Sequence, residues 1–184
     1  MRVALLLKGQ VFGLLLVVLL MGGCRTITVT ATDDTCKKSV EVHLVGVNRF
    51  EKSRWQSVSM TEYWKPGSDL RKSSKGYRHT IQFPLRPETL LKEETPCHKV
   101  LAEEDKDPIW GIWKVRSAEY LFVLADLPRG VRKFKDLSGN ADARRLCLPL
   151  DKDCWEKSKI DLSIEAANIV SLTMPKSKPQ CQCD

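Results

Sequence analysis

The stretch AEYLFVLADL at residues 118–127 decides the fold of this chain, because it is a compact apolar run well inside the sequence. We interpret it as a central strand that is buried on both faces, although periodicity alone would also fit a short helix. Three other segments alternate apolar and polar residues with the period of two that is typical of half-buried strands. They are residues 40–46 (VEVHLVG), 55–64 (WQSVSMTEYW) and 77–83 (YRHTIQF).

The remaining segments add short elements between turn signals. Residues 146–150 and 160–171 are further strand candidates, residues 88–92 are a candidate helix in a charged loop that reaches residue 108, and residues 130–145 form a long polar loop. Many short strands with few helical stripes predict an all-β fold, a β-sandwich with a short helical insertion. The chain has 184 residues, of which 42% are hydrophobic and 29% charged, and this composition excludes disordered, collagen-like and polytopic membrane proteins.

The N-terminus has the pattern of an export signal. A short basic start ends at Lys8, and residues 11–20 (VFGLLLVVLL) form an apolar core of secretory length that is too short for a typical membrane span. Small residues then precede Cys24 in Met21-Gly22-Gly23-Cys24, which resembles the lipobox of bacterial lipoproteins. That resemblance implies a signal peptide at residues 1–23 and acyl chains on Cys24. The alternatives are an uncleaved anchor, or ordinary secretory cleavage that leaves Cys24 as a thiol.

The lipobox resemblance also implies a cellular location. Arg25 follows Cys24, and bacterial lipoproteins that stay in the inner membrane have Asp at that position. We therefore expect a lipoprotein in the outer membrane that faces the periplasm. The predicted domains are a lipidated cysteine with a tether at residues 24–38, the sandwich at residues 39–173, and a Pro/Lys/Cys tail at residues 174–184.

The other cysteines fit this compartment. An even number of cysteines in an exported chain predicts disulfides, up to three here, and sequence alone leaves 15 connectivities open. A thiolate metal site is the less favoured alternative, and no metal or cofactor is predicted. The six candidate disulfide cysteines are Cys36, Cys97, Cys147, Cys154, Cys181 and Cys183.

Catalytic motifs are missing from the sequence. It contains no phosphate-binding glycine loop, no Gly-x-Ser-x-Gly and no His-Glu-x-x-His, so the prediction is a protein that is not an enzyme. His43, His79 and His98 are too far apart in sequence to suggest a metal site, and we expect strand-face histidines satisfied by backbone groups. The acidic residues 103–107 (EEDKD) allow a glycosidic carboxylate pair, but a solvated loop is the favoured interpretation.

Two surface hypotheses follow from charge and aromatic content. Basic residues in and beside the predicted loop suggest binding of anionic lipid, glycan or an acidic protein, whereas nucleic acid is a poor partner for an envelope protein. An ordinary solvated loop is the alternative. Trp110 and Trp113, beside the acidic stretch, are candidate anchors of a protein interface. The candidate anion-binding residues are Arg129, Arg132, Lys133, Arg144 and Arg145.

The order of these segments resembles TssJ, the outer-membrane lipoprotein family of type VI secretion systems. The resemblance is carried by the lipobox Cys24, by VEVHLVGVN ending at Asn48, by residues 58–64, by AEYLFVLAD and by IDLSIEAANIVSL at residues 160–172. It implies a transthyretin-like β-sandwich and a loop between early strands that docks onto an inner-membrane-anchored partner. The matching positions lie within residues 48–54, with Asn48, Arg49, Phe50 and Arg54 as the candidate contacts.

Two hypotheses from different classes remain. The first is a lipid-anchored, non-catalytic envelope protein that docks a periplasm-spanning membrane complex, as in a type VI secretion system. The second is a lipoprotein that binds an anionic glycan or lipid through its basic loop.

Overall fold

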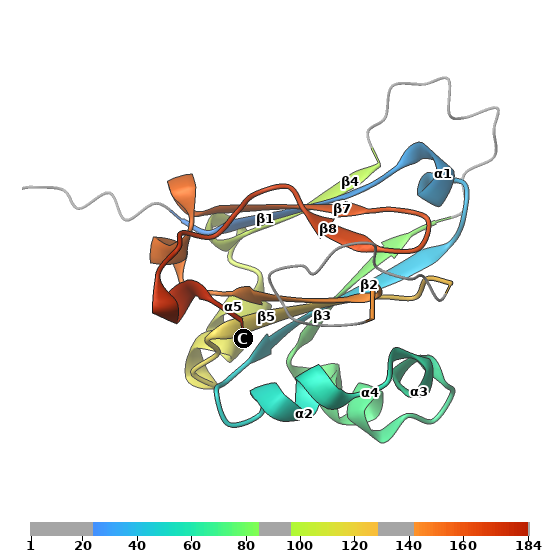
Figure 1. The fold of residues 1–184 in the computed structure, drawn as a ribbon, viewed down its shortest axis with the longest axis horizontal. Helices are drawn as coiled ribbons and strands as arrows, with labels where there is room; N and C mark the ends of the chain where they lie inside the picture. Colours follow the sequence, from blue (N-terminus) through green and yellow to red (C-terminus); the bar gives the residue numbers. More distant parts are fainter. Residues whose placement is uncertain (1–23, 85–96, 129–141, 184) are drawn as a thin grey trace, which may run out of the picture.

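Two four-stranded sheets stack face to face in the computed structural model, which describes residues 24–84, 97–128 and 142–183 (Figure 1). Their strand orders are β4-β1-β7-β8 and β3-β2-β5-β6. The predicted all-β sandwich is therefore confirmed. The strands are β1 (Thr26–Ala31), β2 (Val40–Val47), β3 (Arg78–Phe83), β4 (His98–Ala102), β5 (Tyr120–Ala125), β6 (Arg145–Pro149), β7 (Lys159–Ile164) and β8 (Ile169–Ser171).

The first sheet begins where a tether was predicted. β1 pairs in parallel with β7 and antiparallel with β4, so it lies inside the sheet rather than leading up to it. Ile27 and Val29 are fully buried between the sheets, while the threonines that alternate with them face outward. The tether at residues 24–38 is wrong, because these β-branched residues with period two form a strand.

The second sheet contains the central strand. β5 lies between β2 and β6 and is buried on both faces, as predicted for the apolar run. Its inward residues, such as Val123, belong to the core between the sheets, and its outward residues, such as Phe122, belong to a second core on the other side. The strands predicted at residues 40–46, 77–83, 146–150 and 160–171 are confirmed as β2, β3, β6 and the β7–β8 hairpin.

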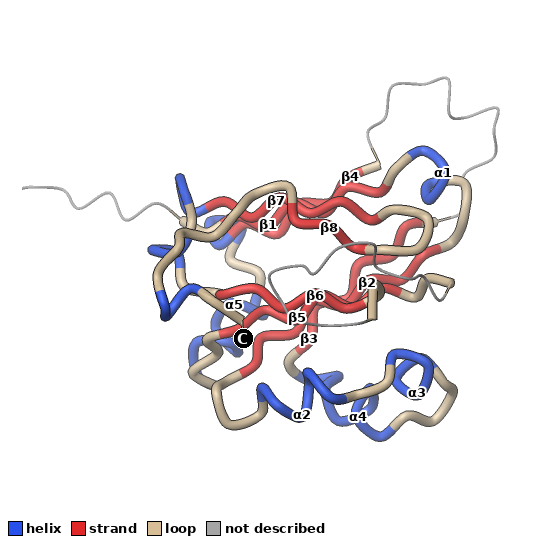
Figure 2. Tube along the Cα trace, in the orientation of Figure 1, coloured by secondary structure: helices blue, strands red, loops and turns tan. Residues whose placement is uncertain are grey.

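Short helices cover the outer face of this second sheet. They are α2 (Lys52–Ser57), α3 (Met60–Trp64) and α4 (Asp69–Ser73), which Figure 2 shows on the side away from the first sheet. The strand predicted at residues 55–64 is therefore wrong. The Ser59 hydroxyl accepts a hydrogen bond from the Glu62 amide and begins α3, and Trp55, Met60 and Tyr63 all point into the second core.

Two elements lie where loops were expected. Residues predicted as a charged loop contain the edge strand β4, and α5 (Pro108–Val115) begins at the Asp107 N-cap, with proline at its first turn. Trp113 of α5 packs onto Gly46, where a Cβ atom would lie 2.5 Å from the indole ring. The helix predicted at residues 88–92 lies outside the described residues.

Three disulfides connect all six candidate cysteines, which confirms that prediction. Cys36 bonds to Cys97, beside the short helix α1 (Asp33–Cys36), while Cys154 bonds to Cys181 and Cys147 bonds to Cys183. The last two bonds hold the tail against the sandwich, with Cys181 in the core between the sheets and Cys183 in the second core. The folded domain therefore extends beyond the predicted limits, from β1 to the tail.

Candidate functional site

The candidate lipid-attachment residue lies at one end of the sandwich, directly beside the fold. Cys24 is exposed, it forms no disulfide, and Arg25 alone separates it from β1. Arg25 is held firmly: its guanidinium donates to both carboxylate oxygens of Glu103 at 3.0 and 3.1 Å and stacks over the Trp110 ring at 4.9 Å. The backbone is also tied, because the Glu103 amide donates to the Arg25 carbonyl at 2.9 Å.

This arrangement fixes the charge of Glu103. Its hydrogen bonds with Arg25 hold the pKa of the carboxyl below its usual value, against the opposing effect of partial burial. Glu103 and Arg25 thus neutralise each other at the base of Cys24.

An open hollow of about 630 Å³ adjoins Cys24. Its lining includes Lys114 from α5, Tyr120 at the start of β5, Lys152 from the turn after β6, and Gln180 from the tail. The sequence had suggested neither lysine, because the two residues come from segments that only the tertiary structure brings together.

The predicted docking segment, residues 48–54, lies at the same end. The chain reverses at α1, so β2 runs back towards the end of the sandwich at which β1 begins (Figure 1). Asn48 follows Val47, the last residue of β2. The Asn48 side chain accepts hydrogen bonds from the amides of Phe50 and Glu51, and Arg49 pairs with Glu119, which lines the hollow.

The side chains of this segment are presented outward. Phe50 is 88% exposed and Arg54 is also exposed. The docking role of Asn48, Arg49, Phe50 and Arg54 stays a prediction. Their location is nevertheless at the Cys24 end, and they connect β2 to a helix rather than to a strand.

The other end of β1 carries the connection between the first two strands, residues 32–39. It contains α1, in which Thr35 and Cys36 are buried while Asp33 and Asp34 are exposed. The Cys36–Cys97 bond joins this connection to the residue before β4. Sequence reasoning missed it as a site because β1 had been assigned to the tether; the alternation of Ile27, Val29 and Ala31 with threonines was the signal that could have found it.

The tryptophans proposed as interface anchors are core residues. Trp110 is 5% exposed and Trp113 is 1% exposed. Trp113 also donates its indole N–H to the Tyr77 carbonyl at 2.8 Å. The prediction of a surface role is wrong for both, because α5 turns its apolar side inward against Gly46 and Arg25.

The proposed anion-binding loop is contradicted at Arg144 and Arg145, while Arg129, Arg132 and Lys133 lie outside the described residues. Arg144 pairs with Asp142 at 2.9 Å, and although burial alone would raise the pKa of that carboxyl, bonds with Arg144 hold it low. Arg145 is 4% exposed and donates to the carbonyls of Trp55 and Val58. Both guanidinium groups thus bond to acceptors within the fold rather than to a surface ligand, because arginine can satisfy several buried acceptors at once.

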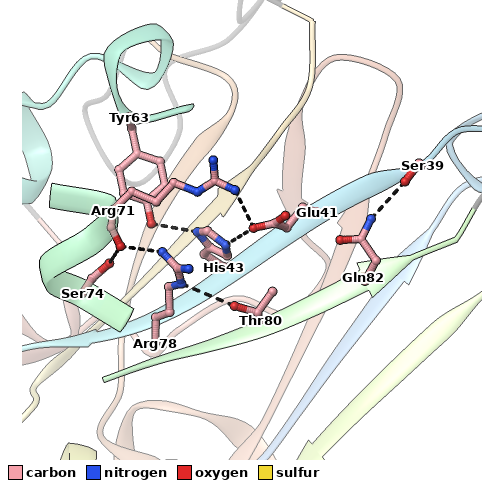
Figure 3. Close-up of polar contacts among 9 residues, drawn as sticks. All are labelled: Ser39, Glu41, His43, Tyr63, Arg71, Ser74, Arg78, Thr80 and Gln82. Atoms are coloured by element: carbon pink, nitrogen blue, oxygen red, sulfur yellow. Dashed lines mark hydrogen bonds and ion pairs between the residues drawn. The ribbon is translucent and has the colours of Figure 1, made fainter. Parts of the chain in front are cut away.

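A buried polar network joins the second sheet to its helices (Figure 3). The His43 ring is fully buried; Nδ1 lies 2.7 Å from the Tyr63 hydroxyl and Nε2 lies 2.5 Å from a Glu41 oxygen. Arg71 of α4 donates to the same Glu41 oxygen at 2.9 Å. His43 is therefore satisfied by side chains, not by the backbone groups expected from the sequence.

Burial lowers the pKa of His43 to about 4, and the nearby charge of Arg78 acts in the same direction. The neutral ring then donates from Nε2 to the Glu41 carboxylate and accepts at Nδ1 from Tyr63. A substrate cannot reach this ring, so we interpret the network as structural.

Other site types receive no support from the described residues. Within residues 24–84, 97–128 and 142–183, no group of three His, Cys, Asp or Glu side chains is arranged to hold a metal ion. In the same ranges, no helix has the length and apolar character that crossing a bilayer would require.

Comparisons with known proteins give remote similarities. No family model matches the sequence, and no curated protein matches it. Among solved structures, the chain is similar to the C-terminal domain of the type VI secretion protein TssM from EAEC, with 10% identity, a TM-score of 0.49, and coverage of 80% of this chain and 99% of that one. It is also similar to Lip from Serratia marcescens, described as a membrane-bound component of the type VI secretion system, with 9% identity, a TM-score of 0.44, and coverage of 81% and 96%.

A third similar structure is the type VI lipoprotein TssJ1 from Pseudomonas aeruginosa, with 13% identity, a TM-score of 0.39, and coverage of 83% and 97%. All three come from the secretion system whose lipoprotein family the sequence resembles. Similarities this remote assign neither a family nor an activity to the chain.

Proposed function

We propose that this chain is a lipid-anchored, non-catalytic envelope protein that docks a periplasm-spanning membrane complex of the type VI secretion kind. Acyl chains on Cys24 hold it in the outer membrane, facing the periplasm, and an inner-membrane-anchored protein is its partner. The observation that carries this role is that different features lie at the two ends of β1. Cys24, the candidate for lipidation, precedes one end, and the exposed connection at residues 32–39 follows the other.

The distance between these ends suits a docking protein. β1 has six residues, which at about 3.3 Å each separate Cys24 from α1 by about 20 Å. A domain held by Cys24 therefore presents α1 away from its own membrane, towards a partner that rises from the opposite one.

We propose the connection at residues 32–39 as the docking surface, in place of residues 48–54, because the latter lie at the Cys24 end and would face the membrane that holds the anchor. The family resemblance implies docking through a loop between early strands, and with β1 at Thr26–Ala31 the first such loop is this one. Asp33 and Asp34 are exposed there on a helix that Thr35 and the Cys36–Cys97 bond hold in place. A pre-ordered acidic pair loses little conformational entropy on binding and selects a partner with basic residues.

The test is capture of the partner by the full, lipidated chain in its own envelope. The tagged protein is cross-linked in cells and purified from detergent-solubilised membranes, and the retained proteins are identified by mass spectrometry. The variant Asp33→Lys with Asp34→Lys reverses the charge of the connection. Its matched control is Glu104→Lys with Asp105→Lys, which makes the same change at an exposed acidic pair at the Cys24 end.

We expect saturable capture of an inner-membrane protein with a periplasmic domain, a loss of about tenfold or more for the Asp33/Asp34 variant, and wild-type capture for the control. If neither variant changes capture, the connection is not the docking surface. If the wild-type protein retains only lipid or glycan, the docking function itself is wrong.

A further inference from the structure

The short link between Cys24 and β1 determines what the acyl chains would do to the domain. With Arg25 as the only intervening residue, the sulfur of Cys24 lies within about 10 Å of the first residue of β1. Arg25 cannot act as a swivel, because its side chain and its backbone are both bonded to Glu103. Acyl chains that enter a bilayer must therefore bring this end of the sandwich into the headgroup layer.

The charges at this end suit an anionic surface. Three of the carboxylates there are neutralised in place: Glu103 pairs with Arg25, Glu119 pairs with Arg49, and Glu51 pairs with Arg116, while Glu104 and Asp105 are exposed. Lys114 and Lys152 are exposed beside Cys24, and neither forms a salt bridge with another described residue. Asp151 is the acidic lining residue outside these pairs, and it accepts the Asp153 amide as a turn cap.

Two large apolar side chains project from the same end. Phe50 is 88% exposed and Val115 is 87% exposed, which makes them the most exposed large hydrophobic residues in the described part of the chain. One ion pair joins the two segments that carry them, because Glu51, next to Phe50, bonds to Arg116, next to Val115, at 2.8 Å. An aromatic and an aliphatic tip flanked by lysines is the composition of a surface that lies in a membrane interface.

From these contacts we infer that the Cys24 end is a membrane-contact face, on which Lys114 and Lys152 bind phosphates of anionic phospholipid headgroups while Phe50 and Val115 enter the interfacial layer. This inference rests on the proposed acylation of Cys24. The occupant is the bilayer that holds the acyl chains rather than a protein, because a partner rising from the opposite membrane would have to displace the headgroups around the anchor. The contact fixes the orientation of the domain, so that α1 points into the periplasm.

The experiment uses the full lipidated protein, purified from membranes and reconstituted into vesicles of phosphatidylethanolamine with or without phosphatidylglycerol. Mass spectrometry of the intact protein first shows whether Cys24 carries acyl chains. Backbone hydrogen exchange is then followed in residues 49–54 and 114–119, with residues 33–39 as the internal reference. The charge variant is Lys114→Glu with Lys152→Glu, and its matched control is Lys37→Glu with Lys38→Glu, an exposed lysine pair at the opposite end.

We expect exchange in the two test segments to be about tenfold slower with phosphatidylglycerol than without it, and residues 33–39 to be unaffected. The Lys114/Lys152 variant loses this difference, the Lys37/Lys38 variant keeps it, and Phe50→Ser with Val115→Ser weakens protection in both vesicle types. If Cys24 is acylated but the Lys114/Lys152 variant shows the same exchange as the wild type, the proposed membrane-contact face is wrong and the anchor is unaffected. If Cys24 carries no acyl chains, both the proposed lipid anchor and the membrane-contact face are wrong.

Discussion

The outer faces of the two sheets are built differently. On the sheet β4-β1-β7-β8 the outward residues stay in contact with solvent, as in Thr28, Thr30 and the half-exposed Val100. On the sheet β3-β2-β5-β6 the outward residues Phe122 and Leu124 are fully buried beneath helices. Strands with a solvent-exposed outer face therefore alternate apolar and polar residues in the sequence, whereas strands buried on both faces form continuous apolar runs.

The covered face also contains buried polar groups, among them His43 and Arg145. His43 bonds to both Glu41 and Tyr63 there, and Arg145 donates to the carbonyls of Trp55 in α2 and of Val58, just after α2. Burying polar groups is costly unless each finds a partner, so this face stabilises the domain through apolar contact and is sensitive to any change that breaks its bonds.

The largest difference between the faces should appear when an aromatic residue is removed. Trp55 of α2 is 1% exposed and packs against Tyr63, Tyr77 and Phe122. We expect Trp55→Ala to lower the free energy of unfolding by about 3–5 kcal/mol, because it leaves a cavity beneath the helices. Val100→Ala, on the solvent-exposed outer face of the sheet β4-β1-β7-β8 (the bare face), should lower the free energy of unfolding by less than about 1 kcal/mol. Urea unfolding of the oxidised proteins measures both, and equal losses would show that α2 does not cover the sheet.

A second difference should appear with pH. The unfolded state protonates histidine near its ordinary pKa, whereas His43 in the fold has a pKa of about 4, so the unfolded state binds more protons between these values. Stability should therefore fall by about 2 kcal/mol as the pH drops from about 7 to 5. This range lies above the titration of Glu41, whose pKa burial alone would raise but Arg71 and His43 hold low.

The variant His43→Gln tests this assignment, since its amide can still donate to Glu41 and accept from Tyr63. We expect the pH slope to be largely lost in this variant. A slope that remained at its wild-type size would place the titration elsewhere in the chain.

A smaller effect is expected at the start of α3. Ser59→Ala removes the hydroxyl that accepts the Glu62 amide and should cost about 1 kcal/mol. Ser59→Asp retains an acceptor at the same position and should recover most of the loss in the same unfolding measurement. No loss in the alanine variant would mean that the helix cover does not depend on this cap.

The smallest effect should come from the bare face. Thr28 of β1 points away from the core, so Thr28→Lys should change the free energy of unfolding by about 0.5 kcal/mol or less. Its inward neighbour gives the contrast, since Val29→Lys would bury an unpaired ammonium and should prevent folding. If Thr28→Lys were as damaging, the outer face of this sheet would have to be covered.

Local sequence determined much of the sandwich. The alternation at residues 40–46 and 77–83 and the apolar run at residues 118–127 became β2, β3 and β5, because the period of the side chains is itself the burial pattern of a strand. The even number of cysteines after the predicted export signal likewise indicated disulfides, although not their partners.

Only the tertiary structure decided the rest. Residues 55–64 are helical because their aromatic side chains pack on a sheet face that the local pattern does not reveal. The alternation at residues 26–31 is a local strand signal, but only the pairing with β4 and β7 places that strand inside a sheet. Arg144, Arg145, Trp110 and Trp113 looked like surface residues and are buried, since acceptors and apolar neighbours distant in sequence surround them. The Cys24 end gathers Arg25, Lys114 and Lys152 from three separate segments, and such convergence depends on chain reversal and strand pairing rather than on any local preference.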